Sequence, residues 1–274
     1  MPPRLLALDL DGTALRRDGT LAPLDVQAAL ALRRAGVIVT IVTGRLFSGT
    51  RWVARELGIG GLVAVMNGCE VVEVDSGRVH HGRYLGGESL DLLRATLPTA
   101  RVASTLFRSG GIHHGHDSVG HRPAYALWTT EVFAHDDIYA LPGWGGDDIL
   151  GVGVVGPGPV ISELRGALIP RLGNSVGAME FPLSTGGQFL ALHRAEDDKG
   201  TGLERIAASH GLALDDCVAV GDWINDYAFL GAAGRSFAMA HAPDSLKAVA
   251  DEVLDADTVR GGAIAEVARR VWGI

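Results

Sequence analysis

The chain has 274 residues, of which 47% are hydrophobic and 20% are charged, and this composition predicts a globular protein of one or two domains rather than a disordered chain. Its 24 basic and 32 acidic residues give a net charge of −8 without a Lys/Arg cluster, which argues against a nucleic-acid partner. The two cysteines, Cys69 and Cys217, lie far apart beside apolar stretches, so we expect buried thiols and a reducing cytoplasm.

The apolar runs of the chain are short. The run at 5–8 is soon interrupted by Asp9, so we interpret it as a first strand and not as a signal peptide. No run approaches the roughly 20 apolar residues that a membrane helix requires. We therefore expect a soluble, cytoplasmic protein with no membrane partner.

Short runs rich in Val, Ile and Leu alternate with longer segments of helical spacing. This alternation is typical of parallel strands that are buried on both faces, and it places the chain in the α/β class. The first part of the chain predicts a strand at 5–10, a helix at 23–35, a strand at 37–42, a helix at 46–57 and a strand at 62–66.

The rhythm changes after Val71, where two strand-like pieces flank Asp75-Ser76-Gly77 and predict a hairpin. Helix-like pieces at 90–97 and 160–172 and strand-like pieces at 151–155 and 175–181 follow, joined by Gly/Pro-rich segments. The earlier rhythm then returns, with helices at 200–210, 227–233 and 263–272 and strands at 217–220 and 236–239.

This pattern predicts a Rossmann-like parallel-sheet core with an inserted α/β cap domain. The core is expected at residues 1–82 and 191–274, and the cap at 83–190. The cap would close over the core, exclude water and select the substrate.

Polar residues stand directly after the predicted strands. In an open parallel sheet, ligands bind outside the carboxyl ends of the strands, so these residues are the candidates for chemistry. They are Asp9 and Asp11 after the first strand, Thr43 and Gly44 after the second, Asp222 after the strand at 217–220, and Lys199 at the start of the helix at 200–210.

Three carboxylates on one rim would repel each other by about 4 kcal/mol per close pair at an intermediate dielectric constant, unless a cation lies among them. Oxygen-only ligands favour Mg²⁺. Lys199 and Thr43 would then contact phosphate oxygens. Asp9 is a feasible phosphate acceptor, and Asp11 could protonate the leaving oxygen and later activate water.

In this order, and over nearly the whole chain, these residues resemble the haloacid dehalogenase (HAD) superfamily of phosphohydrolases. The resemblance implies that Asp9 is the nucleophile and Asp11 the acid/base, with Thr13 completing the Asp-x-Asp-x-Thr motif. It further implies phosphate binding by Thr43, Gly44, Lys199 and Asn225, metal binding by the side chains of Asp9 and Asp222 and the main-chain carbonyl of Asp11, and support from Asp226.

Four short segments are similar to the Cof-type subgroup, subclass IIB, which carries a large α/β cap. They are Thr43-Gly44-Arg45, Asn67-Gly68, Asp198-Lys199-Gly200 and Gly221-Asp222-Trp223-Ile224-Asn225-Asp226. The resemblance implies a Mg²⁺-dependent phosphatase that acts on small phosphorylated metabolites, in the first place sugar phosphates. Ala14 departs from the family pattern, where a larger apolar residue is usual.

Other interpretations stay open. Asp9-x-Asp11 alone is common turn chemistry, and only the four motifs together argue against that interpretation. A phosphomutase or phosphotransferase of the same superfamily would share the phospho-aspartate, and a non-catalytic phosphate-binding module would share the acidic cluster. The histidines His113, His114, His116 and His121 match no standard metal site, and we place them in a cap loop without a role. The leaving group and the oligomeric state are unknown.

Overall fold

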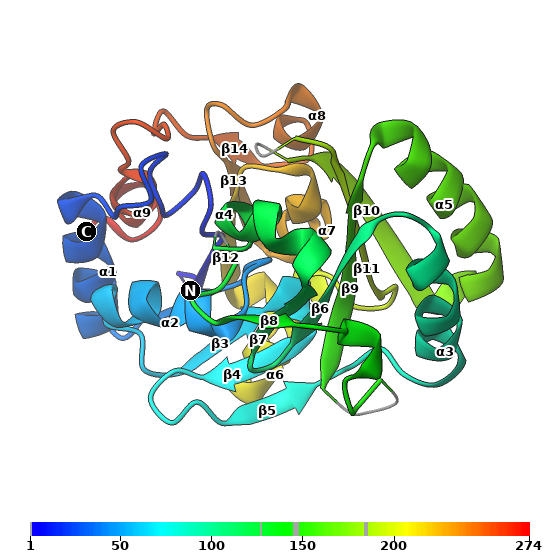
Figure 1. The fold of residues 1–274 in the computed structure, drawn as a ribbon. Coiled ribbons are helices and arrows are strands. Elements are labelled where there is room, and N and C mark those ends of the chain that lie inside the picture. Colours follow the sequence, from blue (N-terminus) through cyan, green and yellow to red (C-terminus); the bar gives the residue numbers. More distant parts are fainter. Residues whose placement is uncertain (1, 127, 145–147, 184–185) are drawn as a thin grey trace. The chain divides into compact units, whose positions relative to one another are not determined.

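The chain forms two compact units. The computed structural model describes residues 2–126, 128–144, 148–183 and 186–274. The first unit, the core, consists of Met1–Gly44, Thr50–Gly82 and Asp198–Ile274, and the second, the cap, of Arg45–Gly49 and Arg83–Asp197. In Figure 1 the core is blue to cyan and yellow to red, and the cap is mostly green. The predicted α/β class is confirmed.

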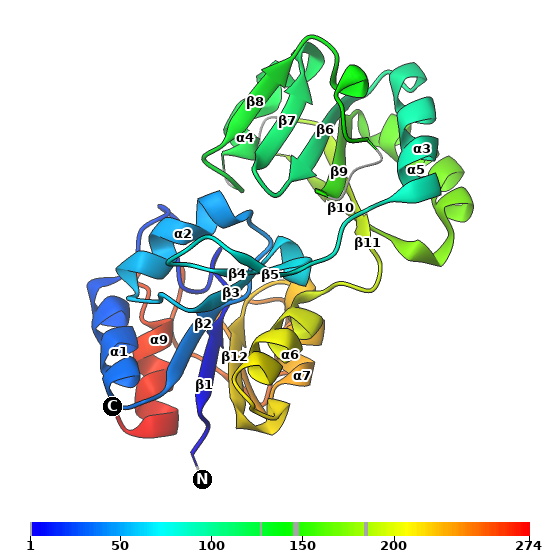
Figure 2. The same ribbon diagram turned by 90° about the horizontal axis from the view of Figure 1, so that it is seen from below.

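The core contains a five-stranded parallel sheet in the order β14-β13-β12-β1-β2. All residues of the central strand β1 are fully buried, as expected for a strand covered on both faces. Figure 2 shows helices α1 and α9 on one face of this sheet and α6 and α7 on the other. The strands are β1 (Leu5–Leu8), β2 (Ile38–Ile41), β12 (Cys217–Gly221), β13 (Arg235–Ala238) and β14 (Glu252–Val253).

The predicted core helices begin and end close to the expected positions, whereas α8 was not predicted. The final helix changes from α-helical to π-helical hydrogen bonding after Val267 and ends at Trp272. The α-helices are α1 (Pro23–Arg34), α2 (Phe47–Glu56), α6 (Lys199–Ser209), α7 (Tyr227–Ala232), α8 (Asp244–Lys247) and α9 (Ala263–Val267), and the shorter turns are η1 (Met66–Gly68), η6 (Leu214–Asp216), η7 (Ile224–Asp226) and the π-helical η8 (Ala268–Trp272).

A second, antiparallel sheet of the core contains β3 (Leu62–Val65), β4 (Glu70–Glu73) and β5 (Val79–Gly82). The hairpin predicted around Asp75-Ser76-Gly77 joins β4 to β5. We predicted the strand at 62–66 as a further parallel strand. It makes one parallel bridge, between Val42 and Ala64, and otherwise pairs antiparallel with β4, because the short turn η1 returns the chain alongside it.

The cap contains a six-stranded sheet in the order β10-β11-β9-β6-β7-β8, in which only the described pair β7 and β8 is parallel. Leucines of α3 and α5 pack against Val152 and Val154 to form the apolar core of this unit. The strands are β6 (Ala103–Arg108), β7 (Gly111–Gly115), β8 (Val132–His135), β9 (Ile149–Gly156), β10 (Val176–Pro182) and β11 (Gln188–Arg194). The helices are α3 (Gly87–Thr96), α4 (Arg122–Tyr125) and α5 (Gly158–Leu172), with shorter turns η2 (Leu97–Thr99), η3 (His116–His121), η4 (Ile138–Ala140) and η5 (Gly173–Ser175).

Two expectations about the cap differ from the structure. The predicted end of the cap, residue 190, lies inside β11, and the compact unit continues to Asp197 because this whole strand pairs with β9 and β10. The loop predicted for the histidines is wrong, because His113 and His114 belong to β7 and His116 and His121 to η3. His114 is buried with Nδ1 2.8 Å from the Gly115 carbonyl, and Nδ1 of His113 lies 2.9 Å from Nε2 of His135.

Both cysteines are buried free thiols, as predicted. Burial raises the pKa of Cys217 to about 11, so this thiol stays protonated. In the described part of the chain, no helix combines the length and the apolar character needed to cross a membrane.

A buried carboxylate connects the first and last helices of the core. Asp25, in α1, accepts hydrogen bonds from the backbone N–H groups of Gly262 (2.7 Å) and Ala265 (3.0 Å) at the start of α9. Helix N-termini carry N–H groups without a partner inside the helix, and Asp25 satisfies two of them. Burial raises the pKa of Asp25, while these hydrogen bonds oppose the shift.

Replacing Asp25 with alanine should lower the free energy of unfolding by about 1–3 kcal/mol, because two buried N–H groups lose their acceptor. Urea denaturation followed by circular dichroism measures this loss. Glu56→Ala, which removes an exposed carboxylate from α2, is the control and should change stability by less than about 0.5 kcal/mol. Equal stability of the Asp25 variant and wild type would contradict the prediction.

Candidate active site

The candidate site lies at the carboxyl ends of the core strands. The neighbouring strands β13, β12, β1 and β2 are followed by polar residues at this edge of the sheet. They are His241 after β13, Asp222 after β12, Asp9 after β1 and Thr43 after β2. Adjacent parallel strands therefore bring side chains together that are far apart in sequence.

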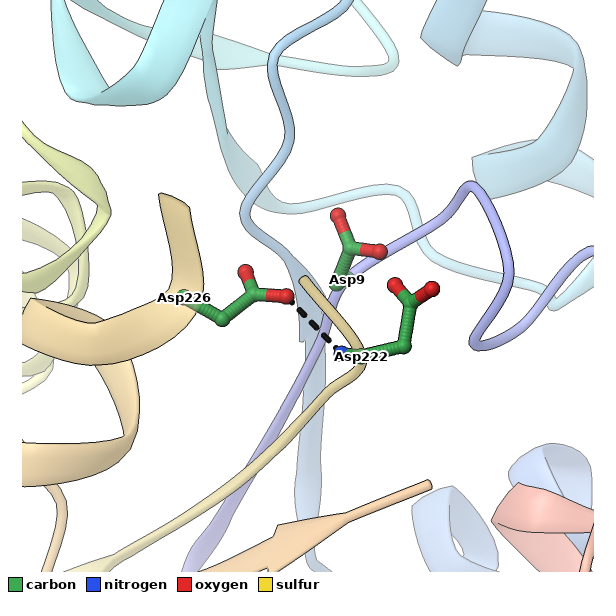
Figure 3. Close-up of side chains that lie close together, drawn as sticks. All are labelled: Asp9, Asp222 and Asp226. Atoms are coloured by element: carbon green, nitrogen blue, oxygen red, sulfur yellow. Dashed lines mark hydrogen bonds between the residues drawn. The ribbon is translucent and has the colours of Figure 1, made fainter. Parts of the chain in front are cut away.

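Three carboxylates lie close together at this edge. Each of Asp9, Asp222 and Asp226 is buried, and each offers a carboxylate oxygen within 4.8 Å of those of the other two. Figure 3 shows Asp9 at the end of β1 and the other two residues on the loop and turn after β12. Carboxylates this close repel strongly unless positive charge compensates them.

Lys199 supplies part of that compensation. Its ammonium nitrogen lies 2.5 Å from Oδ1 of Asp9 and 2.6 Å from Oδ1 of Asp226, and its side chain is 1% exposed. Lys199 is the first residue of α6, and Asp198 caps this helix by accepting a 2.8 Å hydrogen bond from the N–H of Thr201. This hydrogen bond of Asp198 fixes where α6 begins and therefore where Lys199 lies.

The site keeps an excess of negative charge despite this ion pair. Burial and the carboxylates of Asp226 and Asp222 raise the pKa of Asp9 well above its usual value, although Lys199 lowers it. Burial alone would lower the pKa of Lys199, but the carboxylates of Asp226 and Asp9 raise it above its ordinary value, so the ammonium stays charged. Burial and Asp226 also raise the pKa of Asp222. An additional cation would offset the repulsion between these carboxylates.

Asp222 is contacted from several sides. The Thr13 hydroxyl donates to its Oδ1 at 3.2 Å, and Nε2 of His241 lies 3.1 Å from its Oδ2. Gly12 has a φ of +85°, and a Cβ at that position would lie closer to Asp222 Oδ2 than van der Waals contact allows. A glycine is therefore required beside this carboxylate.

Asp226 organises the loop that carries Asp222. Its Oδ2 accepts hydrogen bonds from the N–H groups of Asp222 (2.9 Å) and Trp223 (3.0 Å), the first of which is drawn in Figure 3. In the same turn, the Asn225 side-chain amide donates to Oδ1 of Asn67 at 3.3 Å. Both carboxylate oxygens of Asp226 are thus occupied by groups of the protein.

The other predicted site residues have different surroundings. Thr43 is buried, its N–H donates to the Ala64 carbonyl at 3.0 Å, and its own carbonyl accepts from Asn67. A Cβ added to Gly44 would lie 3.3 Å from Oδ1 of Asn67. Asp11 is exposed and lies outside the carboxylate cluster. Sequence reasoning missed His241, although it follows a predicted strand as Asp9 and Asp222 do.

The five-stranded parallel sheet is a Rossmann-like core, and the carboxylate–lysine cluster lies at its carboxyl edge. A sequence model described as "haloacid dehalogenase-like hydrolase" matches residues 6–267, and the chain belongs to this family of enzymes. The resemblance predicted from the motifs is thereby confirmed.

Individual relatives cover nearly the whole chain. An HMP-PP phosphatase of Yersinia enterocolitica is 29% identical over 244 residues, which cover 89% of this chain and 86% of the relative. A crystal structure from Thermotoga maritima matches with a TM-score of 0.85 at 19% identity, covering 98% of this chain and 97% of the other. A haloacid dehalogenase-like hydrolase of Bacteroides thetaiotaomicron matches with a TM-score of 0.82 at 21% identity, covering 98% and 100%. At these identities the two structures show the shared fold.

The contact between Gly12 and Asp222 generates a test with a matched control. Gly12→Ala should reduce the hydrolysis of an aryl phosphate about 100-fold, because its methyl group displaces the Asp222 carboxylate, and misplacements of about 1 Å have effects of this size. Gly19→Ala is the control, because Gly19 has a similar φ of +78° but no atom within 4 Å of an added Cβ. Both variants carry backbone strain of about 1–2 kcal/mol, so equal losses of activity would contradict the role of the contact.

Proposed function

We propose that the protein is a Mg²⁺-dependent phosphatase that hydrolyses small phosphorylated metabolites through an aspartyl-phosphate on Asp9. The observation that carries this proposal is the buried ion pair between Asp9 and Lys199 beside Asp222. It combines a nucleophilic carboxylate, a fixed positive charge and a second carboxylate at one strand edge. Phosphoryl transfer requires these groups together, because the attacking carboxylate and the phosphate are both anions.

The residues present fit Mg²⁺, because the available ligands are oxygens and the carboxylate cluster carries excess negative charge. We assign the Asp9 and Asp222 side chains and the Asp11 carbonyl as its protein ligands. We assign Asp226 a supporting role, because Lys199 and two backbone N–H groups already engage its oxygens. A bound Mg²⁺ would withdraw charge from the phosphate oxygens and shield the attacking carboxylate from them.

Each residue of the site then has its own role in the reaction. A carboxylate oxygen of Asp9 attacks phosphorus while Asp11 gives its proton to the leaving oxygen, and the bond between phosphorus and that oxygen breaks. Asp11 next accepts a proton from the water that attacks the aspartyl-phosphate, which releases inorganic phosphate and restores Asp9. Lys199, Thr43, Gly44 and Asn225 orient the phosphoryl group.

Two classes of substrate are candidates for this site. Sugar phosphates are the class implied by the motif resemblance, whereas the Yersinia relatives are named HMP-PP phosphatases. A screen that measures phosphate released from sugar phosphates, from HMP-PP and from other phosphorylated metabolites compares these possibilities directly. The preferred compound is the one with the highest kcat/KM.

Asp9→Asn should abolish release of phosphate from an aryl phosphate, because the amide is a poor nucleophile and a poor Mg²⁺ ligand. The wild type should lose the same activity in EDTA and regain it with added Mg²⁺. Asp18→Asn is the control, since it changes an exposed carboxylate in the same N-terminal loop and should leave turnover unchanged. Near-normal turnover of the Asp9 variant would refute the proposed mechanism.

Lys199→Met should lower kcat about 10²–10³-fold, the range seen when one preorganised donor to a developing charge is removed. It should also lower the free energy of unfolding by about 3–5 kcal/mol, because Asp9 and Asp226 lose their buried cation. Steady-state kinetics and thermal denaturation measure the two effects. Lys247→Met, at the other lysine of the chain, is the control; undiminished activity of Lys199→Met would remove Lys199 from the site.

A further inference from the structure

His241 contacts the site from a strand end to which the motifs assign no role. It lies between β13 and α8, and its Nε2 is 3.1 Å from Oδ2 of Asp222, 19 residues earlier in the chain. A carboxylate only accepts hydrogen bonds, so we assign the proton to Nε2, which donates it to Asp222. Because β13 and β12 are neighbours in the sheet, this contact follows from the strand order.

His241 and Thr13 form hydrogen bonds with different oxygens of the Asp222 carboxylate. Thr13 donates to Oδ1 and His241 to Oδ2, so rotation of the carboxylate about its Cβ–Cγ bond breaks both hydrogen bonds. A carboxylate oxygen has two lone-pair sites, so each oxygen keeps one for a cation. The close approach of Gly12 restricts movement toward a third side. Asp222 is thus held in one orientation before any ligand binds.

A packing role alone does not account for His241. Its side chain is 32% exposed, whereas that of Asp222 is 10% exposed. Within the part of the chain that the structure describes, the imidazole makes no hydrogen bond other than the one to Asp222. The contact is therefore directed at one carboxylate, and the loss of the ring would leave the apolar core intact.

We propose that His241 is a positioning residue that sets the affinity of the site for its divalent cation by fixing the Asp222 carboxylate. The inference rests on the proposed function, because it takes Asp222 as a ligand of Mg²⁺. His241 touches neither the substrate nor the reacting atoms. Loss of an outer hydrogen bond to a metal ligand typically weakens metal affinity 10–100-fold, and we expect an effect of this size.

The test measures Mg²⁺ binding without substrate. Isothermal titration of MgCl₂ into metal-free protein should give a Kd that is about 10–100-fold higher for His241→Ala than for wild type. His241→Gln, whose side-chain amide can donate a similar hydrogen bond, should recover most of the affinity. His80→Ala is the control, because His80 is an exposed histidine on β5 that contacts Glu73 and Arg78 and no residue of the carboxylate cluster.

Kinetics provide a second readout. The Mg²⁺ concentration for half-maximal turnover should rise in His241→Ala by the same factor as Kd, while kcat at saturating Mg²⁺ stays close to the wild-type value. An unchanged Kd in His241→Ala would overturn the inference, and so would equal losses in His241→Ala and His80→Ala. If wild type itself binds no Mg²⁺, the proposed function fails as well; if wild type binds Mg²⁺ and His241→Ala binds it equally, only the role of His241 fails.

Discussion

The Lys199 ammonium, held between Asp9 and Asp226, is the contact on which the arrangement of the site depends. It joins chain positions that are 190 residues apart and removes all three charged groups from water. The desolvation of buried ions offsets much of their attraction, so such a pair contributes less to stability than to position. Here it fixes the direction of the Asp9 carboxylate and, through Asp226, the backbone that carries Asp222. The ion pair therefore connects the end of β1, the loop after β12 and the start of α6.

The parallel sheet explains why the carboxylates of the cluster lie together. Parallel strands end at one edge, where their polar continuations meet, and three carboxylates at such an edge need more positive charge than one lysine provides. Burial, together with the neighbouring carboxylates, raises the pKa of Asp9 and of Asp222. The Mg²⁺ proposed above would supply this missing positive charge.

The sequence was sufficient to predict β1, β2, β12 and β13 and the convergence of Asp9, Asp222 and Lys199 at one edge of the sheet, because buried parallel strands are continuous apolar runs and their ends carry the polar residues. It was insufficient for β3, whose apolar residues suit a parallel or an antiparallel partner equally well. It also missed β7, since Gly111-Ile112-His113-His114-Gly115 shows no apolar alternation. His241 was missed because one histidine after a strand carries no motif, and only the register of neighbouring strands gives it a partner.

The position of β1 has a consequence for synthesis of the chain. β1 pairs with β2 on one side and with β12 on the other, and β12 begins only at Cys217. A growing chain that ends before this point has one edge of its central strand unpaired and lacks Asp222 and Asp226. Most of the cap, residues 83–197, is already complete at that stage. On the ribosome the inserted unit is therefore available to fold before the core that surrounds it in sequence, and the carboxylate cluster around Asp9 is completed only afterwards.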